Sequence, residues 1–221
     1  MTRILLAGAT GMVGSAALAL LLADDRVTRV VAPTRLALPH HAKLLNPIMD
    51  SSGIPEEAEW WAVDGTICAL GTTRAKTPSP AAYRAIDHDY PLAIAAQVRR
   101  HGATRFALTS SMGADPRSRF RYPRIKGELE DAIDLLDFAS LTIVRPGVLG
   151  GDRHEYRAGE RMIGALLRIA APILPTAARV SPAATVAALL VEGALTGTPG
   201  RHVVGSAAIA RASAAAGSRP R

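Results

Sequence analysis

Short apolar runs alternate with longer segments of helical character along this chain. Strands are predicted where an apolar run of about five residues ends at glycine, proline or a polar pair, at residues 3–7, 28–32, 66–70, 105–109 and 141–145. Helices are predicted between them, at residues 12–23, in a segment ending near Gly102, and at residues 123–138. Pro91 marks the first turn of the middle helix or a break within it. A weaker run at 44–49 predicts one more short strand.

Strands that alternate with helices predict right-handed βαβ units, and therefore an α/β fold with a doubly wound, Rossmann-like parallel sheet between two helical layers. The 221 residues, of which 48% are hydrophobic, can bury one core, so a single domain over residues 1–211 is expected. Within it, residues from about 150 to 211 are expected to form a small substrate or lid region. Residues 212–221 are small, polar and basic, and are expected to be a flexible tail.

The composition indicates which cellular environment and which partners to expect for this domain. The one cysteine, Cys68, cannot form a disulfide within the chain and lies in an apolar run, which is typical of a buried core thiol. No run reaches the ~18–20 apolar residues that a membrane span needs. A reducing, cytoplasmic location is therefore expected. The net charge of +7 is scattered and accompanies no recognition-helix pattern, so neither a nucleic acid nor a membrane is expected as a partner.

A glycine-rich stretch follows the first predicted strand and opens the first predicted helix. Its spacing is G-x-x-G-x-x-G over residues 8–14. Glycines allow a tight turn and a close approach of a pyrophosphate to backbone N–H groups at the start of a helix, where the helix dipole favours negative charge. The strand and helix around it supply the context that this motif requires. The predicted cofactor-binding residues of this turn are Gly8, Thr10, Gly11, Met12, Val13 and Gly14.

The residues after the second strand indicate which nucleotide would bind. Sites that prefer NAD place an acidic residue there for the ribose 2′-hydroxyl, whereas an arginine accommodates a 2′-phosphate. Here Pro33 is followed by Thr34 and Arg35, with no acid. Arg35 can hold a phosphate with two hydrogen bonds and Thr34 adds a hydroxyl. NADP(H) is the preferred cofactor on this chemistry, and NAD(H) is the alternative.

A proton-transfer unit is predicted downstream. Tyr122 and Lys126 are four residues apart and so share one face of a helix. An isolated tyrosine phenol has a pKa near ~10, and a neighbouring ammonium lowers such a value toward neutral pH. Ser110 and Ser111 follow the fifth strand, at the sheet edge where parallel sheets bind ligands, and either hydroxyl could polarise a carbonyl.

These segments, in this order, resemble the short-chain dehydrogenase/reductase superfamily, and within it the atypical single-domain NAD(P)H-binding members related to the Tat-interacting oxidoreductase of animals. The matching residues cover roughly 3–160. They are Gly8–Gly14, Leu70-Gly71-Thr72-Thr73-Arg74, Ser110–Asp115, Tyr122–Lys126 with Gly127-Glu128, and Arg145-Pro146-Gly147-Val148-Leu149.

The resemblance implies a role for each matching position. Tyr122 would be the acid/base, and Lys126 would tune it and bind the nicotinamide ribose. Ser111 matches the catalytic serine, with Ser110 as the alternative. The remaining implied cofactor contacts are Leu70, Gly71 and Thr72 beside the adenosine, Asp50 at the adenine, and Pro146 and Gly147 at the nicotinamide. The implied reaction moves a hydride between the nicotinamide and a small carbonyl or alcohol substrate.

Other interpretations remain beside this one. The arginines at 117–124 and 153–161 are interpreted as solvated or phosphate-binding, and alternatively as a lid over an anionic substrate. An NADPH-binding redox sensor with little turnover is the alternative function, and a nucleotide-sugar epimerase or dehydratase is disfavoured because little chain follows Leu149. His40, His41 and His154 lack a third ligand at a recognised spacing, so no metal is expected. The choice between monomer and homodimer stays open.

Overall fold

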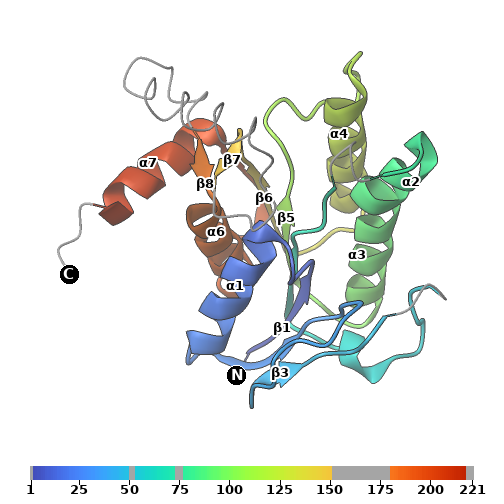
Figure 1. The fold of residues 1–221 in the computed structure, drawn as a ribbon, viewed down its shortest axis with the longest axis vertical. Coiled ribbons are helices and arrows are strands. Elements are labelled where there is room, and N and C mark those ends of the chain that lie inside the picture. The colour runs from blue at the N-terminus through green and yellow to red at the C-terminus, as the bar shows by residue number, and fades with distance from the viewer. Residues whose placement is uncertain (1, 50–52, 73–76, 151–179, 218–221) are drawn as a thin grey trace.

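The main sheet runs through the middle of the molecule (Figure 1). The computed structural model describes residues 2–49, 53–72, 77–150 and 180–217. Within these residues seven parallel strands pair in the order β3-β2-β1-β4-β5-β6-β9. Their bounds are Thr2–Ala7 (β1), Val27–Val31 (β2), Leu44–Leu45 (β3), Gly65–Cys68 (β4), Arg105–Thr109 (β5), Ser140–Arg145 (β6) and Gly200–Gly205 (β9). Because the chain moves outward from β1 to β3 and then resumes at β4 on the other side of β1, the fold is the doubly wound, Rossmann-like α/β fold expected from the sequence.

Helices cover both faces of this sheet. On one face lie α1 (Met12–Ala23) and α6 (Ala183–Leu195), and on the other lie α3 (Tyr90–Arg100) and α4 (Arg121–Asp134). The other described elements are η1 (Glu59–Trp61), α2 (Pro80–Arg84), the π-helical turn η3 (Ala85–Asp89), the short parallel pair β7 (Leu149–Gly150) and β8 (Ser181–Pro182), and α7 (Ser206–Gly217). No helix among the described residues is long and apolar enough to cross a membrane.

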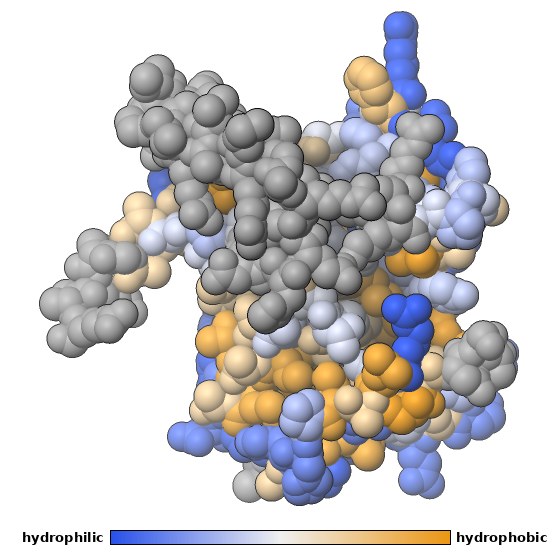
Figure 2. Space-filling model, in the orientation of Figure 1, coloured by the Kyte–Doolittle hydropathy of each residue, from blue (hydrophilic) through white to orange (hydrophobic). Residues whose placement is uncertain are grey.

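Strands covered on both faces need apolar residues at every position rather than at alternate ones. In β1 the consecutive residues Ile4, Leu5 and Leu6 are all fully buried, with Ile4 and Leu6 in the core under α1 and Leu5 in the core under α3. This two-sided burial explains why continuous apolar runs predicted the strands. On the surface, apolar residues gather over the lower half of the face shown in Figure 2, and polar residues follow its lower rim.

Several elements differ from the prediction in extent. The run at 44–49 gives only the two-residue β3, together with an isolated bridge between Thr34 and Ile48. Pro91 lies in the first turn of α3, which is the first of the two alternatives given for it, and the π-helical turn η3 directly precedes α3. The sequence interpretation assigned no element to α6 or β9.

The C-terminal segment is more regular than expected. Helix α7 extends to Gly217, six residues into the segment 212–221 that was predicted to be a flexible tail, because that segment begins with alanines and serine that are compatible with a helix. Residues 180–211, part of the predicted lid region, contribute β9 to the sheet and α6 to its cover. The remainder of that region, residues 151–179, lies outside the described residues.

Candidate active site

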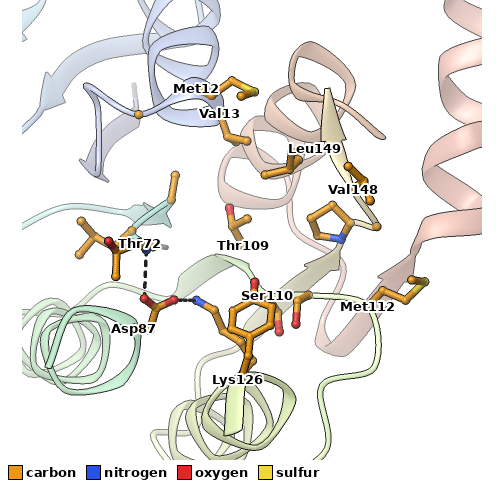
Figure 3. A pocket seen from close by; sticks show the side chains of 18 of the residues that line it. Met12, Val13, Thr72, Asp87, Thr109, Ser110, Met112, Lys126, Val148 and Leu149 are labelled. Carbon is orange, nitrogen blue, oxygen red and sulfur yellow. Dashed lines mark hydrogen bonds and ion pairs between the residues drawn. The ribbon is translucent and has the colours of Figure 1, made fainter. Parts of the chain in front are cut away.

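A cavity of about 700 Å³ opens at the carboxyl ends of β1, β4, β5 and β6 (Figure 3). This is the place where open parallel sheets bind ligands, next to the point where the strand order reverses. Most of the residues proposed from the sequence line it. Those residues are Thr10, Gly11, Met12, Val13, Leu70, Gly71, Thr72, Ser110, Ser111, Tyr122, Lys126, Pro146 and Gly147.

The glycine turn brings the start of α1 close to the sheet. Gly8 has a φ of +88°, which side chains disfavour, and a Cβ there would lie 2.7 Å from the carbonyl oxygen of Ala69. A Cβ on Gly14 would lie 1.9 Å from the carbonyl oxygen of Gly8. Gly8 and Gly14 therefore form the packed base of the turn, while Gly11 caps α1 at the cavity wall. No acidic side chain occupies the first turn of α1, so its N–H groups present a positive field to the cavity.

The loop after β2 does not reach the cavity as the structure describes it. The Thr34 hydroxyl donates to the carbonyl oxygen of Leu36 at 2.6 Å and accepts from the Asn46 amide at 2.7 Å. Its proton is therefore used within the loop in this structure, and the contact between Thr34 and a phosphate stays a prediction. Arg35 beside it is exposed and does not line the cavity. Asp50, the predicted adenine contact, lies outside the described residues.

Tyr122 and Lys126 lie on one face of α4, as their spacing predicts, but at different depths. Tyr122 is 44% exposed, whereas Lys126 is only 3% exposed. The Tyr122 ring meets the ring of Tyr83 edge to face, with 6.5 Å between centroids. Burial, and then the charge of Asp87, raises the pKa of the Tyr83 phenol well above its ordinary value. Tyr83 therefore stays protonated, and of the two adjacent phenols Tyr122 is the one at the mouth of the cavity.

An acidic residue that the sequence interpretation missed lies beside the lysine. Asp87 is 1% exposed and lines the cavity, and its Oδ1 lies 3.0 Å from the Lys126 Nζ. A signal for it exists in the sequence. Residues 83, 87, 91, 94 and 98 follow the spacing of one helix face, and all but Asp87 are aromatic, apolar or proline. An acid on an otherwise buried face is uncommon unless it has a partner.

The two neighbouring serines have different surroundings. Ser110 Oγ donates to the buried carboxylate of Glu130, which also accepts from Arg145 and Arg201. Ser111 Oγ is buried, lines the cavity and has no hydrogen-bond partner within the described residues. Successive residues leaving a strand point to opposite sides, which explains the division. The structure therefore leaves Ser111 as the available hydroxyl.

Glu130 also fixes the end of β6. Its hydrogen bonds raise the pKa of the Arg145 guanidinium above the ordinary value. Just beyond, the Gly147 N–H donates to the Ser181 hydroxyl at 3.2 Å, so this backbone group is satisfied by β8 and is not turned toward the cavity. Pro146 and Gly147 thus shape the wall without offering that donor.

Other candidate groups lie apart from the cavity. Burial raises the pKa of the Cys68 thiol to about 11, in agreement with a core thiol and not a nucleophile. Arg121 donates to the carbonyl oxygen of Pro80, and Arg124 pairs with Glu128 across one helical turn. The arginines at 153–161 and His154 lie outside the described residues. Within the residues that are described, no three His, Cys, Asp or Glu side chains gather as metal ligands would.

Comparison with known proteins gives several relatives. The chain is 36% identical over 169 residues to "Protein fmp52, mitochondrial" of Emericella nidulans, covering 72% of each chain. It is 32% identical over 182 residues to the Aspergillus fumigatus protein of that name, covering 78% of this chain and 77% of the relative. It is also 35% identical over 158 residues to "Protein HTATIP2" of Rattus norvegicus, covering 69% of this chain and 65% of the relative. No protein-family model matches the chain.

Solved structures confirm the fold. MoeE5 in complex with UDP-glucuronic acid and NAD superposes with a TM-score of 0.69 at 17% identity, covering 92% of this chain and 76% of that one. The PhqB reductase domain from Penicillium fellutanum gives 0.66 at 20% identity, covering 92% and 66%. A putative NAD-dependent epimerase/dehydratase from Bacillus halodurans gives 0.57 at 16% identity, covering 96% and 99%.

The relatives contradict one expectation. The cytoplasmic location expected from the sequence is wrong on this comparison, because the fmp52 relatives are named as mitochondrial proteins. The error has a physical origin. The expectation rested on a lone cysteine and on the lack of a long apolar run, and neither feature distinguishes one compartment from another.

Proposed function

This chain belongs to the family of the fmp52 and HTATIP2 proteins, atypical members of the short-chain dehydrogenase/reductase superfamily, and on that premise we propose that it is an NADP(H)-dependent oxidoreductase acting on small carbonyl or alcohol substrates. One observation carries the proposal. Tyr122, Lys126 and the buried hydroxyl of Ser111, which has no hydrogen-bond partner among the described residues, line the same cavity as the glycine turn at the start of α1.

The residues present fit a nicotinamide dinucleotide. The turn at Gly8 and Gly14 leaves no space for side chains, so backbone N–H groups at the start of α1 line the cavity where a pyrophosphate would bind. A cavity of about 700 Å³ falls within the range of small-molecule sites. MoeE5, whose fold this chain shares, was solved in complex with NAD. When bound, the reduced cofactor would supply a hydride to the carbonyl carbon of the substrate.

The side chains around the cavity supply the proton chemistry. The Ser111 hydroxyl would donate a hydrogen bond to the carbonyl oxygen and so fix and polarise it. The Tyr122 hydroxyl would deliver its proton to the same oxygen as negative charge develops there, giving the alcohol. The buried Lys126 ammonium would stabilise the resulting phenolate until solvent reaches the exposed Tyr122 and returns a proton.

Replacing Ser111 by alanine is expected to lower kcat for carbonyl reduction by roughly 10²–10³-fold, the usual effect of losing one donor to a developing oxyanion. Replacing Ser110 is expected to leave kcat largely intact and to destabilise the fold by about 1 kcal/mol, because its hydroxyl serves Glu130. Steady-state kinetics over a panel of aldehydes and ketones, with urea unfolding of both variants, measures these effects. A larger loss of kcat in the Ser110 variant than in the Ser111 variant would assign the catalytic role to Ser110.

Arg35 is proposed to select the 2′-phosphate of NADP(H) by turning toward it from its exposed position. Arg35→Ala is then expected to weaken NADPH binding roughly 10- to 100-fold, the range for lost hydrogen bonds to a charged group, and to leave NADH binding nearly unchanged. Fluorescence titration with both nucleotides measures this. Arg29→Ala, which removes an exposed arginine from β2, is the matched control.

The same titration tests the function itself. Tight NADPH binding by the wild type justifies a search for the carbonyl substrate. Equal NADPH affinity in Arg35→Ala would remove the proposed cofactor preference while leaving the reaction type intact. Absence of binding of both nucleotides to the wild type would overturn the oxidoreductase proposal.

A further inference from the structure

Large apolar side chains are exposed at one side of the cavity. Met112 follows β5 and is 49% exposed, Val148 follows β6 and is 53% exposed, and both line the cavity. Figure 3 shows these two side chains at one side of the cavity, with Thr72 and Asp87 at the other. A single exposed apolar side chain is ordinary on an open surface, but several of them in a concave wall beside polar groups are typical of a ligand site.

Hydrogen bonds hold this apolar side of the wall in place. The backbone N–H of Met112 donates to the carbonyl oxygen of Pro146 at 2.8 Å, which joins the loop after β5 to the loop that carries Val148. The Met112 sulfur also accepts a weak hydrogen bond from the Ser206 hydroxyl at 3.5 Å, at the start of α7. Met112 is therefore exposed to the cavity although its backbone and its sulfur are both anchored.

The charged groups of the wall lie elsewhere and neutralise each other. Among the described residues that line the cavity, only Asp87 and Lys126 have charged side chains, and these form an ion pair with 3.0 Å between Oδ1 and Nζ. The arginines at 117–124 do not line the cavity, and Arg121 donates to a backbone carbonyl instead. Within the described part of the chain, the apolar side of the cavity therefore offers no cation to an anionic substrate.

We propose that the substrate is an uncharged carbonyl compound with an apolar, preferably aromatic body, and that Met112 and Val148 select it. The inference rests on the proposed function and adds the class of substrate to it. Because Met112 directly follows Ser111, the group attached to a carbonyl held by the Ser111 hydroxyl would lie against the methionine. A thioether makes favourable contacts with aromatic rings, and its flexible chain adapts to their shape. A carboxylate on that group would lose its water without gaining a partner.

The first test compares benzaldehyde with 4-carboxybenzaldehyde in NADPH-dependent reduction. The two compounds share the ring and the reacting group and differ in charge. We expect kcat/KM to be about tenfold or more higher for benzaldehyde, because the carboxylate is desolvated without compensation. From propanal to hexanal, kcat/KM is expected to rise about two- to fourfold for each added methylene. Equal values for the charged and the neutral aromatic aldehyde, or no rise along the aliphatic series, would overturn the proposal.

Met112→Lys tests the residue itself. The added ammonium is expected to lower kcat/KM for benzaldehyde and to raise it for 4-carboxybenzaldehyde, so that their ratio changes by about tenfold or more in favour of the carboxylate. The gain is expected to shrink at high ionic strength. A variant that merely misfolds would lose both activities, and Val148→Lys would then take its place with the same expected change.

Leu135→Lys is the matched control for this change of specificity. It adds the same charge at an apolar residue that is 87% exposed and does not line the cavity, and it is expected to keep the wild-type ratio. If the ratio stayed at the wild-type value in both cavity variants, or changed equally in the control, Met112 and Val148 would not select the substrate.

A second readout needs no turnover. Saturation-transfer NMR on the NADPH-loaded protein compares benzamide, which is neutral, with benzoate, which has nearly the same shape and a negative charge. Benzamide is expected to receive saturation from the wild type and to lose most of it in Met112→Lys, whereas benzoate is expected to receive it only in that variant. Binding of benzoate to the wild type as strongly as benzamide would contradict the proposed class of substrate.

The outcomes separate this proposal from the proposed function. A wild type that binds NADPH and prefers the carboxylate would overturn the substrate class alone. Failure of the wild type to bind either nucleotide would overturn the proposed function, and the substrate class with it. If NADPH binds and none of these aldehydes is reduced, the comparison of benzamide with benzoate still decides which class of molecule the site takes.

Discussion

Tyr122→Phe is expected to lower kcat for carbonyl reduction by about 10²–10⁴-fold, the contribution usual for one general acid. The substitution removes only the hydroxyl, and the ring that meets Tyr83 edge to face is kept. NADPH affinity is expected to change little, because no other proposed nucleotide contact is altered. Single-turnover oxidation of bound NADPH by an aldehyde separates the rate of the chemical step from binding.

Tyr83→Phe is the control for this prediction, because it removes the neighbouring phenol hydroxyl, which burial keeps protonated. It is expected to retain most of the wild-type rate. If Tyr83→Phe lost activity and Tyr122→Phe kept it, the assignment of the proton donor would be wrong. Loss of nucleotide binding in Tyr122→Phe would instead make the tyrosine a binding residue.

Gly14→Ala is expected to have the largest effect on the fold. The added Cβ would lie 1.9 Å from the carbonyl oxygen of Gly8 and 2.7 Å from its carbonyl carbon, and neither backbone atom can rotate away as a side chain can. Helix α1 would have to move off the turn that it packs against. Overpacking in a tight site costs about 1–3 kcal/mol and occasionally more, and this contact belongs at the upper end of that range or above it.

Urea unfolding of Gly14→Ala, together with an NADPH titration, measures both consequences. Gly205→Ala is the matched control, since a Cβ at Gly205 meets nothing within 4 Å and its φ is not positive. The control is expected to stay within about 1 kcal/mol of the wild type. If Gly14→Ala had the same stability and the same NADPH affinity as the wild type, the turn would open more easily than its contacts indicate.

The parts of the site that the sequence predicted are those with a local signal. The spacing of Tyr122 and Lys126 follows from the helix period, and the glycine turn lies between a buried strand and a helix with small residues. Continuous apolar runs gave five strands because both faces of the sheet are covered. Strand β9 was not predicted, because its six residues include Arg201 and His202, which interrupt any apolar run.

What the sequence did not predict depends on contacts between distant residues. Asp87 pairs with Lys126 across 39 positions, and Ser110 is engaged by Glu130, 20 residues away. The Thr34 hydroxyl was predicted from the sequence to bind a phosphate, whereas in the structure it hydrogen-bonds to Asn46 and to the carbonyl of Leu36. Ser110 and Thr34 were singled out from the sequence and Asp87 was not, but in all three cases the partner is set by the tertiary fold.

The burial of Cys68 has a practical consequence for labelling. It is the one cysteine of the chain, it is fully buried, and burial raises its pKa to about 11, so thiol reagents would find little thiolate at neutral pH. A cysteine introduced at an exposed position would then be the one reactive thiol of an otherwise native protein. Val148, which lines the cavity and is 53% exposed, offers such a position at the entrance. Because Cys68 would not react, an environment-sensitive dye would attach only to the introduced cysteine. The fluorescence of that dye would then report the entry of a ligand directly.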